Sequence, residues 1–152
     1  MISAIVLDTT PLGLMTGRQD RAEPHACRTW AMQVLASGVS LYVPEIADYE
    51  VRRELIRSGK TAGIERLNVF LTLATFLPLT TPTMRLAAEL WAQARNSGTP
   101  TAAPDALDGD VIVAAQALSL SLSDENFIVA TENVRHLSRF VPAGRWQDIP
   151  SG

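Results

Sequence analysis

Short apolar runs alternate along the chain with longer segments in which apolar residues recur every three or four positions. The short runs predict strands that are buried on both faces, as in a parallel sheet; they lie at 2–7, 39–43, 76–79 and 127–130, with a last edge strand at 145–149. The longer segments predict helices at 23–37, 45–57, 61–74, 81–96, 108–120 and 134–140. Residues 11–21, before the first of these helices, are predicted to form a helical turn and a loop. This alternation predicts one three-layer α/β domain over residues 1–152, with a mainly parallel central sheet flanked by helices.

Two of the helix starts carry residues that favour initiation. Pro44 suits the first turn of the helix that follows it. Thr81 and Pro82 predict an N-cap and a first helical position.

The stretch from Asp108 to Ala117 places two acids at the start of a helix that is apolar on most sides. Such a helix is normally buried between other layers. A carboxylate in its first turn would lie in the positive field of the helix N-terminus. Asp108 or Asp110 could equally be an ordinary capping acid, because aspartate is common at helix starts.

Polar residues also follow two of the predicted strands. Asp8 comes directly after the first apolar run, and Thr131, Glu132 and Asn133 follow the run that ends at residue 130. Ligands of open α/β sheets bind at the carboxyl ends of the strands. The competing interpretation of Asp8 is a turn or capping residue before Pro11.

Composition and charge narrow the class of protein. Hydrophobic residues make up 47% of the 152 residues and charged residues 19%, within the ordinary range for a compact domain. No apolar run is long enough to span a membrane, and the start of the chain lacks the features of a signal peptide. Cys27 is the single cysteine, which excludes an internal disulfide. These features fit a cytoplasmic protein. The formal net charge of −3 gives no global basic field, although a local arginine patch would suffice for binding nucleic acid.

Three acids therefore stand out: Asp8 after the first strand, Glu50 on an early helix, and Asp110 at the start of the apolar helix. Glu50 and Glu54 are four residues apart and share a helix face. For Glu54 the simpler interpretation is an ordinary charged residue on a solvated helix face. Carboxylate oxygens suit Mg²⁺ or Mn²⁺, not zinc. Carboxylates that lie close together repel one another unless a divalent cation neutralises them.

At these positions the sequence resembles the PIN-domain family, and within it the VapC-like ribonucleases of toxin–antitoxin modules. The matching stretches are Val6-Leu7-Asp8-Thr9, Tyr49-Glu50-Val51-Arg52-Arg53-Glu54-Leu55, Asp110-Val111-Ile112-Val113-Ala114-Ala115-Gln116-Ala117 and Val129-Ala130-Thr131-Glu132-Asn133. Their order and spacing cover nearly the whole chain. The resemblance implies an endoribonuclease that depends on Mg²⁺ or Mn²⁺ and hydrolyses RNA phosphodiesters.

The resemblance also implies roles for individual residues. Asp8, Glu50 and Asp110 would be the catalytic, metal-binding acids, and Thr131 would be the threonine near the metals. Asn133 stands where the family often has an acid, so it would be a neutral metal ligand. The sequence leaves open whether the site holds one metal ion or two. Asp108 or Glu132 would supply further charge.

Several cations near these motifs are candidates for contacts with the substrate. Arg52, Arg53 and Arg135 would bind RNA phosphates, because arginine contacts phosphate in a bidentate manner. An ordinary solvated charge is an equal alternative for each. His136 is interpreted as a structural or surface residue, since no nucleophile lies beside it in the sequence.

The leading hypothesis is a toxin ribonuclease with an RNA substrate and a cognate antitoxin as a separate chain. The alternatives are a module of the same fold that binds RNA or protein without catalysis, and a nuclease that acts on DNA or in RNA maturation. A homodimer is also predicted, because apolar residues crowd two successive helices and large apolar patches mark interfaces; these residues are Leu67, Phe70, Leu71, Leu73, Leu86, Leu90 and Trp91. The simpler alternative is that they pack under the sheet.

Overall fold

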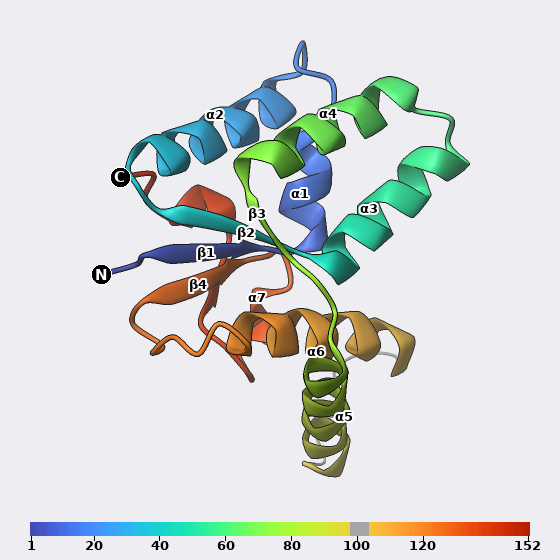
Figure 1. The fold of residues 1–152 in the computed structure, drawn as a ribbon, viewed down its shortest axis with the longest axis vertical. Helices are drawn as coiled ribbons and strands as arrows, with labels where there is room; N and C mark the ends of the chain where they lie inside the picture. Colours follow the sequence, from blue (N-terminus) through green and yellow to red (C-terminus); the bar gives the residue numbers. More distant parts are fainter. Residues whose placement is uncertain (98–103) are drawn as a thin grey trace.

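The structure, a computed structural model, describes residues 1–97 and 104–152, with the side chains of 104–107 outside the description. Its centre is a parallel sheet with strand order β3-β2-β1-β4-β5 (Figure 1). The strands are β1 (Ala4–Leu7), β2 (Ser40–Pro44), β3 (Thr75–Leu77), β4 (Phe127–Ala130) and β5 (Ala143–Gly144). Ala4 lies opposite Ser40 on one side and Phe127 on the other. The predicted parallel sheet is confirmed.

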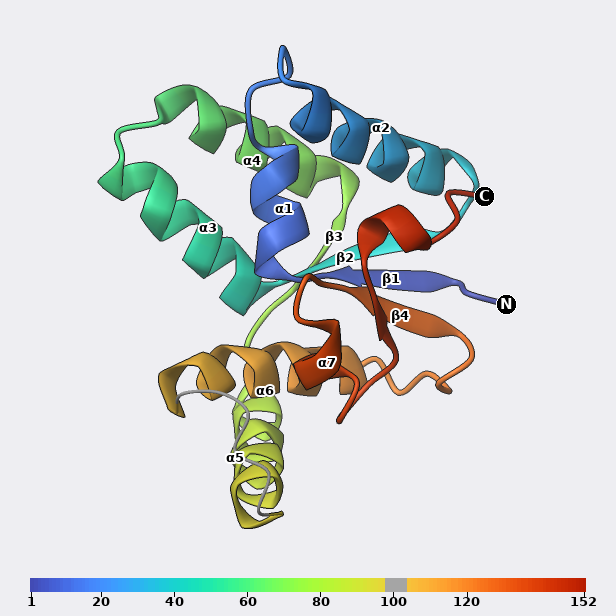
Figure 2. The same ribbon diagram turned by 180° about the vertical axis from the view of Figure 1, so that it is seen from behind.

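Helices cover both faces of this sheet, which gives the predicted three layers (Figures 1 and 2). One face carries α1 (Thr9–Met15), α2 (Ala22–Ala36), α3 (Glu45–Arg57), α4 (Thr61–Leu73) and the short 3₁₀ helix η1 (Trp146–Asp148). The other face carries α5 (Thr81–Asn96), α6 (Pro104–Leu118) and α7 (Val134–Leu137). No helix in the described residues combines the length and the apolar character needed to cross a membrane.

The central strand divides its side chains between two cores. Ile5 and Leu7 of β1 pack under α1 to α4, while Ala4 and Val6 pack against α6. Successive side chains of a strand point to opposite faces, so a strand covered on both sides must be apolar at every position. This is why the continuous apolar run at the start of the chain predicted a central strand correctly.

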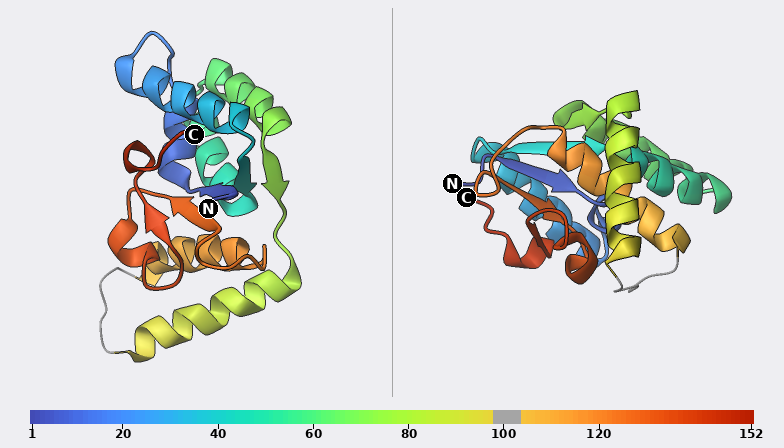
Figure 3. Two further views of the ribbon diagram at one scale, coloured as in Figure 1. Left: turned by 90° about the vertical axis from the view of Figure 1, so that its left-hand side faces the viewer. Right: turned by 90° about the horizontal axis from the view of Figure 1, so that it is seen from below.

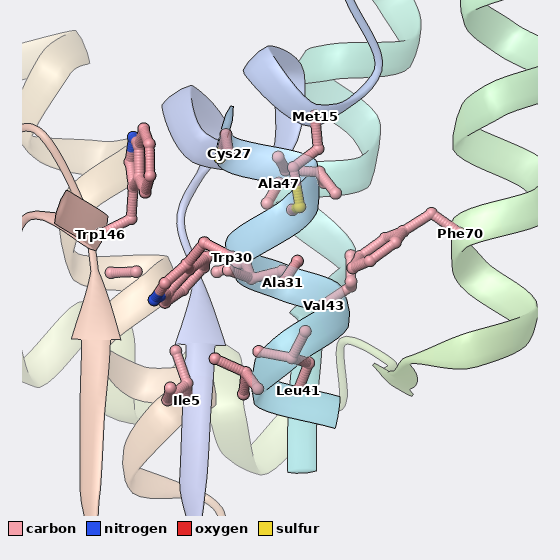
Figure 4. Packing of buried hydrophobic residues seen from close by; sticks show 14 of the residues in the cluster. Ile5, Met15, Cys27, Trp30, Ala31, Leu41, Val43, Ala47, Phe70 and Trp146 are labelled. Carbon is pink, nitrogen blue, oxygen red and sulfur yellow. The ribbon is translucent and has the colours of Figure 1, made fainter. Parts of the chain in front are cut away.

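The first core is closed at its edge by two tryptophans (Figure 4). The rings of Trp30 and Trp146 lie with centroids 5.9 Å apart, and Trp30 Nε1 donates a hydrogen bond to the carbonyl of Ile149 at 2.8 Å. This packing explains why the prediction for the last segment of the chain is wrong. The predicted edge strand at 145–149 is instead the helix η1, preceded by the two-residue strand β5, because Trp146 turns into the core.

The predicted helix starts at 45, 61, 81 and 134 are confirmed, whereas α2 begins one residue before its predicted start and α6 begins four residues before it. α6 begins at Pro104, four residues before Asp108, so Asp108 and Asp110 lie beyond its first turn. Proline is favoured at the start of a helix because it has no N–H to leave unpaired. The predicted loop at 98–103 lies outside the described residues. Thr80, not Thr81, caps α5, and Pro44 precedes α3 instead of starting it.

Most residues that suggested a dimer surface are buried within the chain. Leu67, Phe70 and Leu90 are buried. Leu71, Leu86 and Trp91 are partly buried and pack against one of the two cores. Leu73 is exposed. α5 lies outermost, packed on α6 at one end of the molecule (Figure 3). The simpler interpretation, packing inside one domain, therefore accounts for much of this apolar surface.

Candidate functional site

Asp8 lies at the carboxyl end of β1, where the chain enters α1. Its Oδ1 accepts the backbone N–H of Thr9 at 2.7 Å, so Asp8 is the N-cap of α1. Its Oδ2 accepts the hydroxyl of Thr131 at 2.7 Å. The carboxylate is only 8% exposed. Asp8 is thus both the cap that the sequence allowed and a buried acid held in one orientation by two strand ends.

Glu50 approaches the same place from α3. Its Oε1 accepts the hydroxyl of Thr9 at 3.0 Å, which links it to the residue after Asp8. Gly109 of α6 lies against it, because a Cβ built on this glycine would come within 3.7 Å of both Glu50 carboxylate oxygens. At this point α6 therefore lies close to α3. Arg53 lies on the outer side of Glu50, with a guanidinium nitrogen 3.7 Å from Oε2.

Asp110 enters from α6 and is only 6% exposed. Its Oδ2 is buried and has no hydrogen-bond partner among the described residues. His136 of α7 approaches this oxygen, with Nδ1 at 3.5 Å, which is close enough for an ion pair when the imidazole is protonated. A buried carboxylate oxygen without a donor is unfavourable unless something else binds it.

Asp8 lies close enough to Glu50 and to Asp110 for their charges to interact, and we call these three residues the acid row. Burial raises the pKa of Asp8, and the charge of Glu50 raises it further, against the two hydrogen bonds that lower it. Burial raises the pKa of Asp110 to about 6, and the charge of Asp8 adds to this shift. The side chains of His136 and Asn133 act in the opposite direction on Asp110. Asp8 therefore interacts electrostatically with both of the other acids, Glu50 and Asp110.

The row has the chemistry of a site for a hard divalent cation. It offers carboxylate oxygens, one of them buried without a partner, and no lysine or arginine of the described residues forms an ion pair with Asp8 or Asp110. Among the described residues, no group of three Asp, Glu, His or Cys side chains is close enough together to hold one ion. Mg²⁺, however, is commonly held by one or two carboxylates while it keeps several waters. Asp8 and Asp110 would supply these two carboxylates.

Thr131 and Asn133 support the row from the end of β4. The Thr131 hydroxyl donates to Asp8 and accepts the backbone N–H of Asn133 at 2.9 Å. The loop after β4 is thereby tied to the loop after β1. Asn133 is exposed as a whole, yet its side chain contributes a hydrogen bond that lowers the pKa of Asp110.

Two predicted acids are not brought into the row. Asp108 is exposed and lines a hollow between α5 and α6 together with Met84 and Trp91. Glu132 is exposed and pairs with Arg145, with Oε2 3.4 Å from Nε.

The three predicted arginines differ in their surroundings. Arg52 forms an ion pair with Asp48 one turn earlier, with N–O distances of 2.9 and 3.3 Å. Arg53 lies over the ring of Tyr49, 5.0 Å from its centroid, at the outer edge of the row. Arg135 is exposed on α7. Arg53 is therefore the one that the structure places beside a carboxylate of the row.

Sequence reasoning assigned no role to Thr9 and interpreted His136 as a structural or surface residue. Thr9 joins the supports of Asp8 and Glu50, and its position directly after Asp8 was the available signal. His136 faces Asp110, although the two residues are distant in sequence. Its spacing of three residues from Asn133 was the signal, because residues three apart share a helix face.

Gln116, buried inside α6, connects the elements that carry the row. Its Oε1 accepts the backbone N–H of Ile46 in the first turn of α3 at 3.3 Å, and its Nε2 donates to the carbonyl of Leu77 at 2.7 Å. The helix with Asp110 is thus tied to the start of the helix with Glu50 and to the end of β3.

Comparison with known proteins supports the fold. No protein-family model and no curated protein matches the sequence. Among solved structures, VapBC2 from Rickettsia felis, bound to a DNA fragment from its promoter, is similar with a TM-score of 0.70 at 16% identity, covering 94% of this chain and 98% of that one. FitAcB from Neisseria gonorrhoeae has a TM-score of 0.64 at 21% identity, covering 95% and 99%. VapBC-1 from nontypeable Haemophilus influenzae has a TM-score of 0.63 at 16% identity, with the same coverage of both chains.

Proposed function

Because the chain has a PIN-domain fold like that of VapC toxins, we propose that it is a Mg²⁺- or Mn²⁺-dependent endoribonuclease and the toxin of a type II toxin–antitoxin module. The observation that carries this proposal is the row of acids at the carboxyl edge of the sheet. Asp8 and Asp110 are nearly buried, and each raised pKa reflects burial together with a neighbouring acid. A protein maintains such repulsion where a cation relieves it.

Each residue of the row has a distinct role in this proposal. Asp8 and Asp110 hold the cation, and Glu50 completes the negative field from the side of α3. Thr9 and Thr131 keep Glu50 and Asp8 in place through their hydroxyl groups. His136 fixes the orientation of the Asp110 carboxylate. When bound, the ion would lower the pKa of a water molecule and neutralise charge on the phosphate oxygens.

The substrate in this proposal is RNA, and the partner is a cognate antitoxin chain. Arg53 lies where it can contact a phosphate beside Glu50, and Arg135 is exposed on the helix that carries His136. Asn133 contributes a neutral amide instead of a further carboxylate, so we propose that the pair Asp8 and Asp110 binds a single ion.

Cleavage of RNA by the purified chain tests the proposal. We expect cleavage of single-stranded RNA with Mg²⁺ or Mn²⁺ and none with EDTA. Asp110→Asn should remove most of the activity without unfolding the protein. Glu89→Gln, which removes one carboxylate from the exposed surface of α5 on the other side of the molecule from α3, is the matched control and should keep wild-type activity. An Asp110→Asn protein that is fully active per folded molecule would contradict the assignment.

A second candidate is a binding module that keeps the fold without catalysis. It is favoured by Asn133, which replaces a carboxylate, and by the absence of a three-acid group in the described residues. Calorimetry with Mn²⁺ separates the two candidates. The nuclease should bind Mn²⁺ with a heat that Asp8→Asn abolishes, whereas a binding module shows no such heat and retains its affinity for RNA in EDTA.

A further inference from the structure

A hollow of about 600 Å³ is lined by residues of the α1–α2 loop and of the α3–α4 turn. Figure 2 shows that the α1–α2 loop lies at the end of α1 that points away from the sheet. We call this hollow the outer hollow. Its wall carries four of the chain's 13 lysines and arginines and not one aspartate or glutamate among the described residues. The four cations are Arg18, Arg21, Lys60 and Arg66. In a chain whose net charge is −3, this is a concentrated positive surface.

The four cations are not equally available to a ligand. Arg66 donates from Nε to the carbonyl of Thr16 at 2.7 Å, which fixes it as part of the wall. Arg18 forms an ion pair with Asp20. Arg21 and Lys60 are exposed and make no ion pair with any described residue. Lys60 also precedes α4, whose first turn has no side-chain cap and no acid, so the positive end of that helix is not neutralised.

The outer hollow adjoins a second hollow that includes a residue of the acid row. This second hollow has a volume of about 400 Å³ and is called the inner hollow; its polar lining includes Thr9, Glu50, Arg53 and Glu54. It shares Gly13, Thr16 and Leu55 with the outer hollow. From Thr9 to Thr16 the helix advances about 10 Å, at ~1.5 Å per residue. Stacked nucleotides rise ~3.4 Å each along a strand, so a few nucleotides span this distance.

We propose that the outer hollow binds the phosphates of the RNA strand that flank the phosphodiester at the acid row. This inference rests on the proposed function and adds a substrate path to it. The acid row repels the RNA backbone except where a cation sits, so the affinity for the neighbouring phosphates must come from protein cations elsewhere along the strand. Arg21 and Lys60 are placed to supply it. An acidic protein segment would meet the same cations but has no phosphodiester for the row to act on.

Binding of a fluorescein-labelled single-stranded RNA 20-mer, measured by anisotropy in EDTA over a range of salt, tests this path separately from catalysis. The variant is Arg21→Gln/Lys60→Gln, whose side chains are exposed, so folding is not affected. The slope of log affinity against log salt should be less steep by about 1.4, at ~0.7 per phosphate contact on a single strand. If the affinities converge at 1 M salt, they differ about 25-fold at 0.1 M salt.

The matched control is Arg85→Gln/Arg95→Gln, which removes the same charge from the exposed surface of α5 on the other face of the sheet. It should bind the 20-mer with the wild-type salt slope. Equal slopes for the two double variants would overturn the proposal. So would equal competition for the 20-mer by a poly-glutamate peptide of the same charge, which would identify an acidic protein as the ligand.

Cleavage distinguishes this failure from failure of the proposed function. If the wild type cleaves RNA but both double variants cleave the 20-mer equally well, the path through the outer hollow is wrong and the nuclease stands. If the wild type neither binds nor cleaves RNA, both proposals fail. A dinucleotide has a single phosphodiester, which occupies the row and leaves no phosphate for the outer hollow, so the supporting result is a cleavage defect of Arg21→Gln/Lys60→Gln on the 20-mer that disappears on the dinucleotide.

Discussion

At the scale of single residues, the burial of charged acids in the acid row lowers the free energy of unfolding. Asp110 has a pKa of about 6 in the folded chain, against 3.8 for an ordinary aspartate, chiefly because it is buried and then because Asp8 is charged. The folded state therefore binds the proton more readily than the unfolded state. Ionisation of Asp110 opposes folding, with no cost below about pH 3.8 and the full cost above about pH 6.

Asp110→Asn should consequently raise the free energy of unfolding at pH 7.5 and not at pH 4. In the absence of divalent cations we expect a gain of about 2–3 kcal/mol at pH 7.5, since one unit of pKa corresponds to ~1.4 kcal/mol. Urea unfolding in EDTA at the two pH values measures it. A loss of stability that is the same at both pH values would instead assign Asp110 a structural role in α6.

Thr131 should matter through its hydroxyl alone. Thr131→Val keeps the shape of the side chain but removes the donor to Asp8 Oδ2, leaving a buried carboxylate oxygen without it. We expect a loss of about 1–3 kcal/mol in urea unfolding at pH 7. Thr131→Ser retains the hydroxyl and should lose clearly less. A loss in Thr131→Ser with none in Thr131→Val would show that the methyl group, not the hydrogen bond, is what stabilises this position.

At the scale of elements, the row depends on how α3 and α6 are held together. Gly109 lies beside Glu50, and Gln116 joins α6 to the backbone at the start of α3 and the end of β3. The site therefore depends on helix positions as much as on the acids themselves. A buried glutamine that satisfies two backbone groups is costly to replace by an apolar residue, because both groups lose their partner.

Gln116→Leu should lower the free energy of unfolding by about 1–3 kcal/mol and increase hydrogen exchange at the Ile46 amide. Gln93→Leu, at an exposed position of α5, makes the same chemical change without a buried partner and should leave both quantities near wild type. Ile46 exchange that stays at the wild-type rate in Gln116→Leu would mean that α3 is positioned by packing alone.

At the scale of the whole molecule, the apolar surface is smaller than the sequence indicated. Residues such as Phe70 and Leu90 fill the two cores. Exposed apolar side chains nevertheless remain on α4, β3 and α5, namely Val69, Leu73, Phe76 and Met84. Met84 borders a hollow of about 370 Å³ between α5 and α6.

The homodimer stays a prediction, and these exposed residues are now its candidate surface. Light scattering over a range of micromolar concentrations should give twice the mass of 16.5 kDa. Met84→Lys and Phe76→Lys should each be compared with the wild type, and at least one should shift the mass toward the monomer. A wild-type mass that stays at one chain at all concentrations would rule out the dimer.

The sequence by itself determined the alternation of layers and the edge at which the acids lie. A strand buried on both faces needs a continuous apolar run, and the polar residue that ends the run then lies at the carboxyl edge of the sheet. Asp8 and Thr131 could be placed in this way, and Glu50 and Asp110 followed from the resemblance to a family.

Only the tertiary structure decided which polar neighbours face the row. Asp108 and Asp110 are two residues apart, and a helix turns by about 100° per residue, so they point to different sides and only Asp110 meets Asp8. Local sequence also does not say that α7 folds back to bring His136 against Asp110. Nor does it say that the α1–α2 loop and the α3–α4 turn share one basic hollow. These contacts join residues far apart in the chain, and they depend on the packing of helices whose patterns specify a buried face but not a neighbour.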